Sequence, residues 1–273
     1  MEMEVLMREV DGSPPPSGDV ARPAPAVVAR GAGPFVVGAR ISLADFLALP
    51  SDGVRYDRDE EGRLSLMSPD DFARHRSPIF RLQQRVVRVV PETVQAMVDP
   101  AVAFARIYDL SGNLLPESFL GPKAIQPDLA CYGQEPAAVE GPSGFTFASP
   151  EGLLAVAEVL SPSTYRESLG IGEGDTVNRW RTFLEARVPE YWILNIAVDR
   201  PGCPLPPASA LFLGYDADRG AFSDLVVEGA RPVVEVRGHA AYATGRFRSR
   251  ILPGFELDLE AFFAACAGRG PTS

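Results

Sequence analysis

Two acidic residues stand where metal-dependent chemistry could take place. Glu158 lies inside the nearly continuous apolar run LLAVAEVL at 153–160, and Asp128 follows Pro127 in the segment AIQPDLACY at 124–132. An ionised carboxylate in an apolar strand is costly unless it is paired, protonated or bound to a metal. Two oxygen ligands from neighbouring strands, completed by water and a substrate phosphate, suit Mg²⁺ or Mn²⁺. Such a site activates a water molecule and offsets charge on a leaving phosphate.

The same pattern also has a purely structural explanation. Glu158 could form a salt bridge with a basic residue further along the chain, such as Arg179 or Arg181, at a seam between the sheet and a helix. An acid and a base that pair in this way offset the cost of burial as a metal would. The residues alone therefore leave both explanations open.

The segments around the two acids predict the elements that hold them. The run at 153–160 is apolar nearly throughout, as expected for a central strand covered on both faces. The run at 124–132 is interrupted at Pro127, which favours an edge, a bulge or the beginning of a strand. A helix is expected at 175–186 and a strand at 190–196. Strand, helix and strand in this order are typical of a βαβ unit.

The rest of the chain predicts shorter elements on both sides of this unit. Ser77-Pro78 is expected to begin a helix, because serine suits an N-cap and proline the first helical position. In the last strand of the unit, Tyr191 and Trp192 are expected in the core and Asn195 in a structural or turn role. The other expected elements are a short helix opened by Ser42 and Asp45 and closed by Pro50, a hairpin at 54–67, a strand at 101–108, a Gly/Pro-rich loop at about 133–150, the strand-like runs LFLGYD, DLVVEG and VVEVRG, and a final helix near DLEAFFAAC.

Composition divides the chain into one domain and two flexible ends. Residues 1–34 are rich in Pro, Ala and Gly without sustained apolar periodicity, which predicts a disordered tail. The chain has 273 residues, of which 46% are hydrophobic, so it can bury a full core. We expect a single α/β domain at 35–267, followed by a flexible C-terminus at 268–273.

Charge and hydropathy narrow the classes of function. No stretch approaches the ~20 apolar residues that a membrane helix needs, and the acidic start MEMEVLMREV lacks the basic end of a signal peptide. We therefore expect a cytoplasmic protein without a membrane partner. The formal net charge of −10 works against nonspecific nucleic-acid binding, which would require a local basic patch. Cys131, Cys203 and Cys266 form no CxxC pair, which suggests neither disulfides nor a zinc site.

Several sequence landmarks together resemble the Uma2 family, formerly a domain of unknown function, within the PD-(D/E)XK nuclease superfamily. The most specific are AEVLSPST at 157–164 and VPEYWILN at 188–195, because no general structural requirement would produce both at this spacing. The landmarks are RYDRDEEGRLSLMSP, His75, IQPDLACY, LLAVAEVLSPST, Asp175 with Arg179, VPEYWILN and RILPGFELDLEAFF. The resemblance implies an α/β fold with a restriction-endonuclease-like core, in which helices flank a mixed central β-sheet with added antiparallel strands.

The resemblance also implies roles for particular residues. Asp128 and Glu158 become the acidic ligands of Mg²⁺ or Mn²⁺ in an endonuclease that hydrolyses DNA phosphodiester bonds. Asp57 takes the place of a glutamate near the start of the family's hairpin and would support the metal. His75 falls where the family often carries a histidine, although a surface or capping role is the alternative for it. His75 and Asp175 are carried over as candidate substrate-binding residues.

The chain departs from the family at the basic residue of the site. The wider superfamily has a lysine two positions after the glutamate, where this chain has Leu160, and Uma2-like chains take a lysine from the following helix. That helix position holds Arg179 here. Arginine keeps the charge and can orient a phosphate, but its pKa is too high for it to act as a base. Lys123 is the one lysine of the sequence, so the exchange can reflect composition.

Basic residues on the helix expected after Ser77 are candidates for contact with DNA. Arg81, Arg85 and Arg88 share one face of that helix, although such a stripe is usually a solvated surface. Three functions stay open: a metal-dependent endonuclease, a catalytically degenerate nuclease-fold protein that acts as a binding or regulatory module, and an enzyme acting on another phosphate ester. By analogy with nucleases that cut duplex DNA, the first could act as a homodimer.

Overall fold

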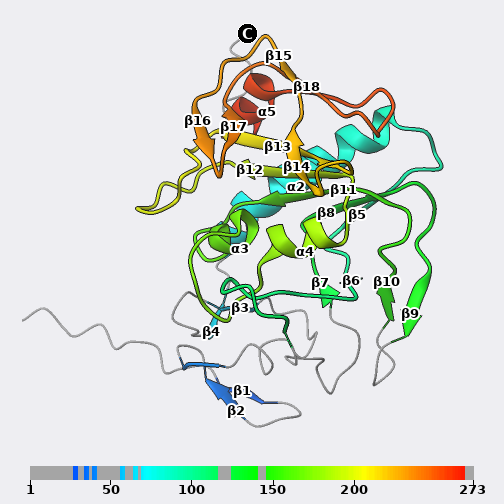
Figure 1. Cartoon of the computed structure of the whole chain (residues 1–273). Helices are drawn as coiled ribbons and strands as arrows, with labels where there is room; N and C mark the ends of the chain where they lie inside the picture. The colour runs from blue at the N-terminus through cyan, green and yellow to red at the C-terminus, as the bar shows by residue number, and fades with distance from the viewer. Residues whose placement is uncertain are drawn as a thin grey trace, which may run out of the picture.

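The computed structural model of the protein (Figure 1) describes residues 27–29, 34–36, 39–41, 56–58, 64–66, 69–115, 124–140 and 146–267. Side chains are described within 39–41, 77–115, 124–140 and 146–267. The short helix predicted from Ser42 to Pro50 lies outside the described residues, as does most of the segment predicted to be a tail.

An eight-stranded mixed sheet forms the centre of the molecule. Its strands follow the order β16-β17-β13-β12-β11-β8-β5, and β14 pairs with the C-terminal half of β13. The strands are β5 (Gln95–Val98), β8 (Leu129–Tyr132), β11 (Leu153–Val159), β12 (Glu190–Asn195), β13 (Ser209–Asp216), β14 (Ala221–Asp224), β16 (Val234–Val236) and β17 (His239–Tyr242).

Strand β11 lies in the interior of this sheet, as its apolar sequence predicts. It runs parallel to β12, with Glu158 opposite Ile193, and antiparallel to β8, with Ala157 opposite Leu129. Parallel neighbours require a crossover connection, and here the chain passes through two short helices between β11 and β12. The predicted βαβ unit is confirmed, and its crossover leads directly out of the strand that carries Glu158.

Helices cover both faces of the sheet (Figure 1). The described helices are α2 (Pro69–Val89), α3 (Tyr165–Leu169), α4 (Arg179–Glu185) and α5 (Leu259–Cys266). Helices α2 and α5 pack on the face that carries Ala155 and Ala157, whereas α3 and α4 pack on the face that carries Val156 and Tyr191. None of these four helices is long and apolar enough to cross a membrane.

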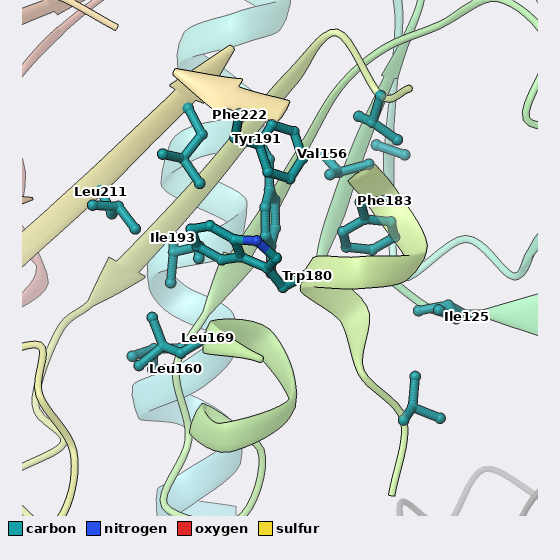
Figure 2. Packing of buried hydrophobic residues seen from close by; sticks show 14 of the residues in the cluster. Ile125, Val156, Leu160, Leu169, Trp180, Phe183, Tyr191, Ile193, Leu211 and Phe222 are labelled. Atoms are coloured by element: carbon teal, nitrogen blue, oxygen red, sulfur yellow. The ribbon is translucent and has the colours of Figure 1, made fainter. Parts of the chain in front are cut away.

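Aromatic side chains fix α4 on the sheet. The rings of Trp180 and Phe183 meet Tyr191 edge to face, at centroid distances of 6.2 and 5.0 Å (Figure 2). Tyr191 and Trp192 are fully buried on opposite faces of β12, which confirms that both belong to the core. Because such aromatic pairs add to area burial, the position of the first residue of α4 is well determined.

The predicted turn role of Asn195 is confirmed. Its Nδ2 donates hydrogen bonds to the carbonyl oxygens of Val198 (2.9 Å) and Leu205 (2.6 Å), and its Oδ1 accepts one from the N–H of Val198 (2.8 Å). Asn195 therefore holds the loop that follows β12 by satisfying buried backbone groups. Cys131, Cys203 and Cys266 are free thiols.

Smaller sheets surround the central one. A four-stranded sheet has the order β7-β6-β10-β9, a three-stranded sheet has the order β15-β18-β19, and two hairpins pair β1 with β2 and β3 with β4. Their bounds are β1 (Val27–Ala29), β2 (Pro34–Val36), β3 (Tyr56–Arg58), β4 (Leu64–Leu66), β6 (Val102–Ala103), β7 (Ala124–Ile125), β9 (Ala138–Glu140), β10 (Thr146–Ala148), β15 (Val227–Glu228), β18 (Arg246–Arg248) and β19 (Glu256–Asp258). The hairpin predicted at 54–67 is confirmed by β3 and β4.

Helix α2 begins earlier than the sequence predicts. It starts at Pro69, so Pro78 lies inside the helix instead of at its first position. The dipeptide Ser-Pro occurs at 68–69 and again at 77–78, and either copy fits a helix start. An interior proline removes one hydrogen bond of the helix, which packing of Ile79, Leu82 and Val86 against the sheet can offset.

The helix predicted at 175–186 is shorter, because its first residues bond elsewhere. The carbonyl oxygen of Thr176 accepts the N–H of Leu110, and the N–H of Asn178 donates to Tyr108. Asn178 then caps α4, because its side-chain Oδ1 accepts a hydrogen bond of 2.9 Å from the N–H of Arg181. Asp175 therefore lies in the exposed segment before α4 and not on the helix.

Two other expectations need correction. The apolar run at 101–108 forms only the two-residue strand β6, and Phe104 and Ile107 are buried in an irregular segment, with Phe104 packed on Phe183 at 5.5 Å. Among the described residues, the run beyond β6 pairs only through an isolated bridge between Tyr108 and Leu114, and the prediction was wrong because an apolar pattern reports burial and not hydrogen bonding. The segment predicted as a loop at about 133–150 contains β9 and β10.

Candidate functional site

Two carboxylates meet where β8 and β11 lie side by side. Asp128 immediately precedes β8, and Glu158 is the last residue but one of β11. Both are nearly inaccessible, with exposed fractions of 8% and 3%. The Oδ2 atom of Asp128 accepts a hydrogen bond of 2.6 Å from the N–H of Val159. The two predicted acids are thus brought together, one of them tied to the residue that follows the other.

The first residue of α4 forms an ion pair with this site. The Nη1 atom of Arg179 lies 2.7 Å from Oε1 of Glu158, and it also donates a hydrogen bond of 2.8 Å to the carbonyl oxygen of Gln126. Gln126 lies just before Pro127 and Asp128, so the guanidinium links the approach to β8 with the end of β11. The salt bridge that the sequence left as an alternative is therefore present, with Arg179 as the partner.

Arg181, the other arginine considered as a partner of Glu158, takes part in a different contact. Its guanidinium stacks on the ring of Tyr108 at 4.2 Å and donates a hydrogen bond of 3.0 Å to the carbonyl oxygen of Gly112. It holds the irregular segment before β7 against α4. The first residue of α4, and not the third, therefore contacts Glu158.

A third carboxylate, that of Glu167 in α3, stands beside the same guanidinium. Its Oε2 atom lies 3.5 Å from Nε of Arg179, and the two side chains are 15% and 17% exposed. Nε is buried and makes no hydrogen bond among the described residues. Sequence reasoning missed Glu167, although Thr164 and Glu167 match the S/T-x-x-E pattern that marks a helix start. That pattern would have placed Glu167 in a helix close behind Glu158.

Gly170 allows the two short helices to approach each other. It ends α3 in the left-handed conformation, with φ of 60°. A Cβ atom at this position would lie 2.7 Å from Cβ of Trp180 and 2.9 Å from Oδ1 of Asn178, so any larger residue would push α4 away. Because Gly170 has no side chain, the end of α3 can approach the start of α4 closely. This approach brings Oε2 of Glu167 to 3.5 Å from Nε of Arg179.

Four ionisable groups of the described structure act on one another here. When the carboxyl groups of Asp128, Glu158 and Glu167 and the guanidinium of Arg179 are all ionised, these four groups together carry a net negative charge. Burial raises the pKa of Glu158 to about 8, with Arg179 opposing the shift and Asp128 and Glu167 adding to it. Burial lowers the pKa of Arg179, but the charges of the three acids outweigh burial and raise it above its usual range. Arg179 therefore stays protonated and does not exchange a proton.

Tyr191 links the sheet to α3, the helix that carries Glu167. Its hydroxyl donates a hydrogen bond of 2.8 Å to the carbonyl oxygen of Ser168, the residue next to Glu167. Burial raises the pKa of Tyr191 well above its usual value, and the charge of Glu158 acts in the same direction. The hydroxyl of Tyr191 therefore stays protonated and holds α3 against β12.

The remaining predicted site residues are not gathered here by the described structure. Asp57 lies in β3 and His75 in α2, and both side chains lie outside the described residues, as does Lys123. Asp175 is exposed in the segment before α4. The roles carried over for these residues stay predictions.

Arg81 and Arg85 lie across the sheet from Glu158. They project from α2, which packs on the opposite face together with α5. Burial raises the pKa of Cys266 in α5 to about 11, while the nearby charges of Arg81 and Arg85 lower it, which places both arginines beside α5. A role for these arginines in DNA binding stays a prediction, and it would involve a different surface of the molecule.

The comparison with known families now decides the relationship. Residues 43–201, more than half of the chain, match the family Uma2, described as "Putative restriction endonuclease". The chain belongs to the Uma2 family. The match contains Asp128, Glu158, Glu167 and Arg179, so all four residues of the cluster lie within the part that Uma2 proteins share. No curated protein matches the sequence.

Two solved structures are similar to this Uma2 chain. One is the crystal structure of a putative nuclease belonging to DUF820 from Anabaena variabilis, at 13% identity and a TM-score of 0.41, covering 83% of this chain and 99% of that chain. The other is NucC of E. coli MS115-1 in its apo form, at 11% identity and a TM-score of 0.26, covering 58% and 84%. Because both TM-scores lie below 0.5, membership of the family rests on the sequence match.

Proposed function

We propose that this protein is a metal-dependent endonuclease that hydrolyses DNA phosphodiester bonds in a restriction-endonuclease-like core. The observation that carries the proposal is the convergence of Asp128, Glu158 and Glu167 on Arg179, in a member of a family described as "Putative restriction endonuclease". Two ionised carboxylates buried side by side are costly in a structural core, and a divalent cation would offset their charge. Perturbed acids of this kind are typical of functional sites.

The residues present fit a hard divalent cation. Asp128 and Glu158 offer carboxylate oxygens from neighbouring strands, which are the donors that Mg²⁺ and Mn²⁺ prefer. Within the part of the chain that the structure describes, no group of three or more His, Cys, Asp or Glu side chains could hold a metal ion. Two carboxylates would therefore share the ion with backbone carbonyls, water or substrate oxygens, as is usual for Mg²⁺.

Each residue of the cluster has a distinct part in this proposal. Asp128 and Glu158 would hold the cation, which when bound activates water and neutralises charge on the phosphate. Arg179 would orient the phosphate group, because its guanidinium carries a permanent charge at the edge of the site. Asp57 would support the metal from the hairpin of β3 and β4. A proton would have to be taken up by water or a carboxylate, because Arg179 holds its own.

A second candidate is a catalytically degenerate protein that binds or regulates without cutting. It is favoured by the contacts that the two acids make within the protein. Oε1 of Glu158 lies 2.7 Å from Nη1 of Arg179, and Oδ2 of Asp128 accepts a hydrogen bond of 2.6 Å from the N–H of Val159. An acid whose oxygens are already satisfied gains less from a metal. The two candidates differ in whether a cation can compete with Arg179.

Cleavage of plasmid and single-stranded DNA with Mg²⁺ or Mn²⁺ tests the proposal. Wild type should cut, and Asp128→Ala and Glu158→Ala should not, whereas Glu173→Ala, an exposed acid between α3 and α4, should cut like wild type. Arg179→Lys shows whether a lysine improves the site. Absence of cutting by every variant, together with no binding of Mn²⁺, would favour the degenerate protein.

Substrate and assembly are tested with the same material. Hydrolysis of another phosphate ester in place of DNA would keep the site and change the substrate. Concerted cutting of both strands of a duplex would support a homodimer, because two sites are then required at once. Sedimentation of the protein with and without duplex DNA measures the assembly directly.

A further inference from the structure

Arg179 forms ion pairs with both Glu158 and Glu167, and its contact with Glu158 poses a problem for a site that must also bind a cation. Glu158 can become a ligand only if it gives up part of its contact with Arg179, because Oε1 is engaged at 2.7 Å. An arginine whose contact with Glu158 is loosened needs another acidic partner in order to stay buried. The second acid beside the guanidinium offers a solution.

We propose that Glu167 is a positioning residue that keeps Arg179 at the carboxylate pair while Glu158 binds a cation. The inference rests on the metal-dependent function proposed above and extends it. The sequence resemblance assigns no role to Glu167. It acts through the arginine and not as a ligand, because its carboxylate lies beside the arginine side chain.

The geometry allows Arg179 to serve both acids through separate donors. Nη1 faces Glu158 and the carbonyl oxygen of Gln126, whereas Nε faces Glu167 at 3.5 Å. A guanidinium has donors on fixed, different edges, so contact with one acid does not exclude contact with the other. A shift of a few tenths of an ångström would complete the bond from Nε to Glu167.

Tertiary contacts hold Glu167 in place. Helix α3 has five residues and would not be stable alone. Arg237, from the turn between β16 and β17, donates to the carbonyl oxygens of Leu169 and Gly170 at the end of α3, and its guanidinium stacks on Trp180 at 4.8 Å. The end of α3 is thus fastened to the residue that follows Arg179. An acid held this firmly beside an arginine suits a positioning role.

The binding of Mn²⁺ to the whole protein, measured by calorimetry, is the first test. We expect Glu167→Gln to weaken binding about fivefold, because Arg179 then remains on Glu158 and competes with the cation. The matched control is Glu173→Gln, which removes the same charge from an exposed residue between the same two helices and should leave binding unchanged. Equal binding by wild type and Glu167→Gln would overturn the proposal.

A double-mutant cycle separates a role through the arginine from a direct one. In an Arg179→Met background, Glu167→Gln should change Mn²⁺ binding by less than about twofold, because the residue through which it acts is gone. The same loss in both backgrounds would make Glu167 a ligand or a distant charge and would overturn the positioning role. Thermal unfolding of each variant verifies that it is folded.

A readout without metal keeps the two proposals distinguishable. The Nε–H resonance of Arg179, assigned by its loss in Arg179→Met, should shift in Glu167→Gln and stay in place in Glu173→Gln. If wild type binds Mn²⁺ but neither the resonance nor the affinity responds to Glu167→Gln, the positioning role alone fails. If wild type binds no Mn²⁺, the proposed function and the positioning role fail together.

Discussion

Two buried glutamates on neighbouring strands have different partners. Glu158 on β11 faces α3 and α4, whereas Glu190 on β12 points to the opposite face of the sheet. Glu190 is 1% exposed and accepts hydrogen bonds from Nε1 of Trp192 (3.0 Å), Oγ of Ser249 (2.8 Å) and the N–H of Arg250 (2.7 Å). Its oxygens therefore fasten the segment after β18 to the sheet.

The difference shows that a buried acid does not by itself indicate a functional site. Burial raises the pKa of Glu190, but hydrogen bonds from Ser249, Arg250 and Trp192 act against that shift. Its donors are two side chains and a backbone amide, and they satisfy it within the fold. Among the described residues, Glu158 has Arg179 as its charged partner, and the charges of Asp128 and Glu167 add to the rise of its pKa. The presence of neighbouring acids, and not burial, distinguishes the candidate site.

The largest expected effect is on cleavage by Glu158→Gln. Glutamine keeps the shape of the side chain and an acceptor for Arg179, but it removes the charge that a cation requires. We expect metal-dependent cutting of plasmid DNA to fall on the order of a thousandfold, with the fold intact. Glu190→Gln, made for comparison, should retain cutting if it folds. Full activity of Glu158→Gln would mean that the site lies elsewhere.

The second largest expected effect is a loss of stability when Glu190 is replaced by alanine. Glu190→Ala leaves three donors without their acceptor, so we expect the free energy of unfolding to fall by about 3 kcal/mol. Binding of Mn²⁺ by the folded fraction should stay as in wild type. Urea denaturation and calorimetry measure the two quantities. Loss of Mn²⁺ binding in a folded Glu190→Ala variant would contradict the separation of the two regions.

The pH dependence of stability offers a smaller, signed test. The pKa of Glu158 is raised by burial from 4.5 to about 8, so the folded protein binds a proton that the unfolded chain releases between these values. The free energy of unfolding contributed by Glu158 is therefore fully present below about pH 4.5 and is lost as the pH rises towards 8. Glu158→Gln should lack this decline in denaturation curves across the same pH range. An identical decline in both proteins would assign it to another group.

The smallest effect is expected from the arginines on the face of Glu190. Arg81→Ala and Arg85→Ala should change cleavage at the α3–α4 face by less than about twofold, because surface substitutions distant from a site cost little. Rates at low and moderate salt measure any loss of phosphate contacts. A tenfold loss that disappears at low salt would show that DNA reaches the α2 and α5 face, and the two regions would then act together.

Much of the framework could be predicted from sequence. The apolar run around Glu158 predicted an interior strand, the order of strand and helix predicted the parallel pair of β11 and β12, and Tyr191 and Trp192 were expected in the core. These predictions succeeded because they depend on local periodicity. The starts of α2 and α4 were predicted wrongly, since one of two equal Ser-Pro signals was chosen at α2 and a loop took the first backbone bonds of α4.

The sequence by itself determined that an acid would be buried in a central strand and that a second acid would enter from the neighbouring one. Only the tertiary structure decided which arginine faces them, because Arg179 and Arg181 have the same type and nearly the same position in the chain. It also decided that Glu167 joins the cluster, through the contact of two short helices at Gly170. Side-chain partners depend on distances between elements, and local sequence patterns carry no information about those distances.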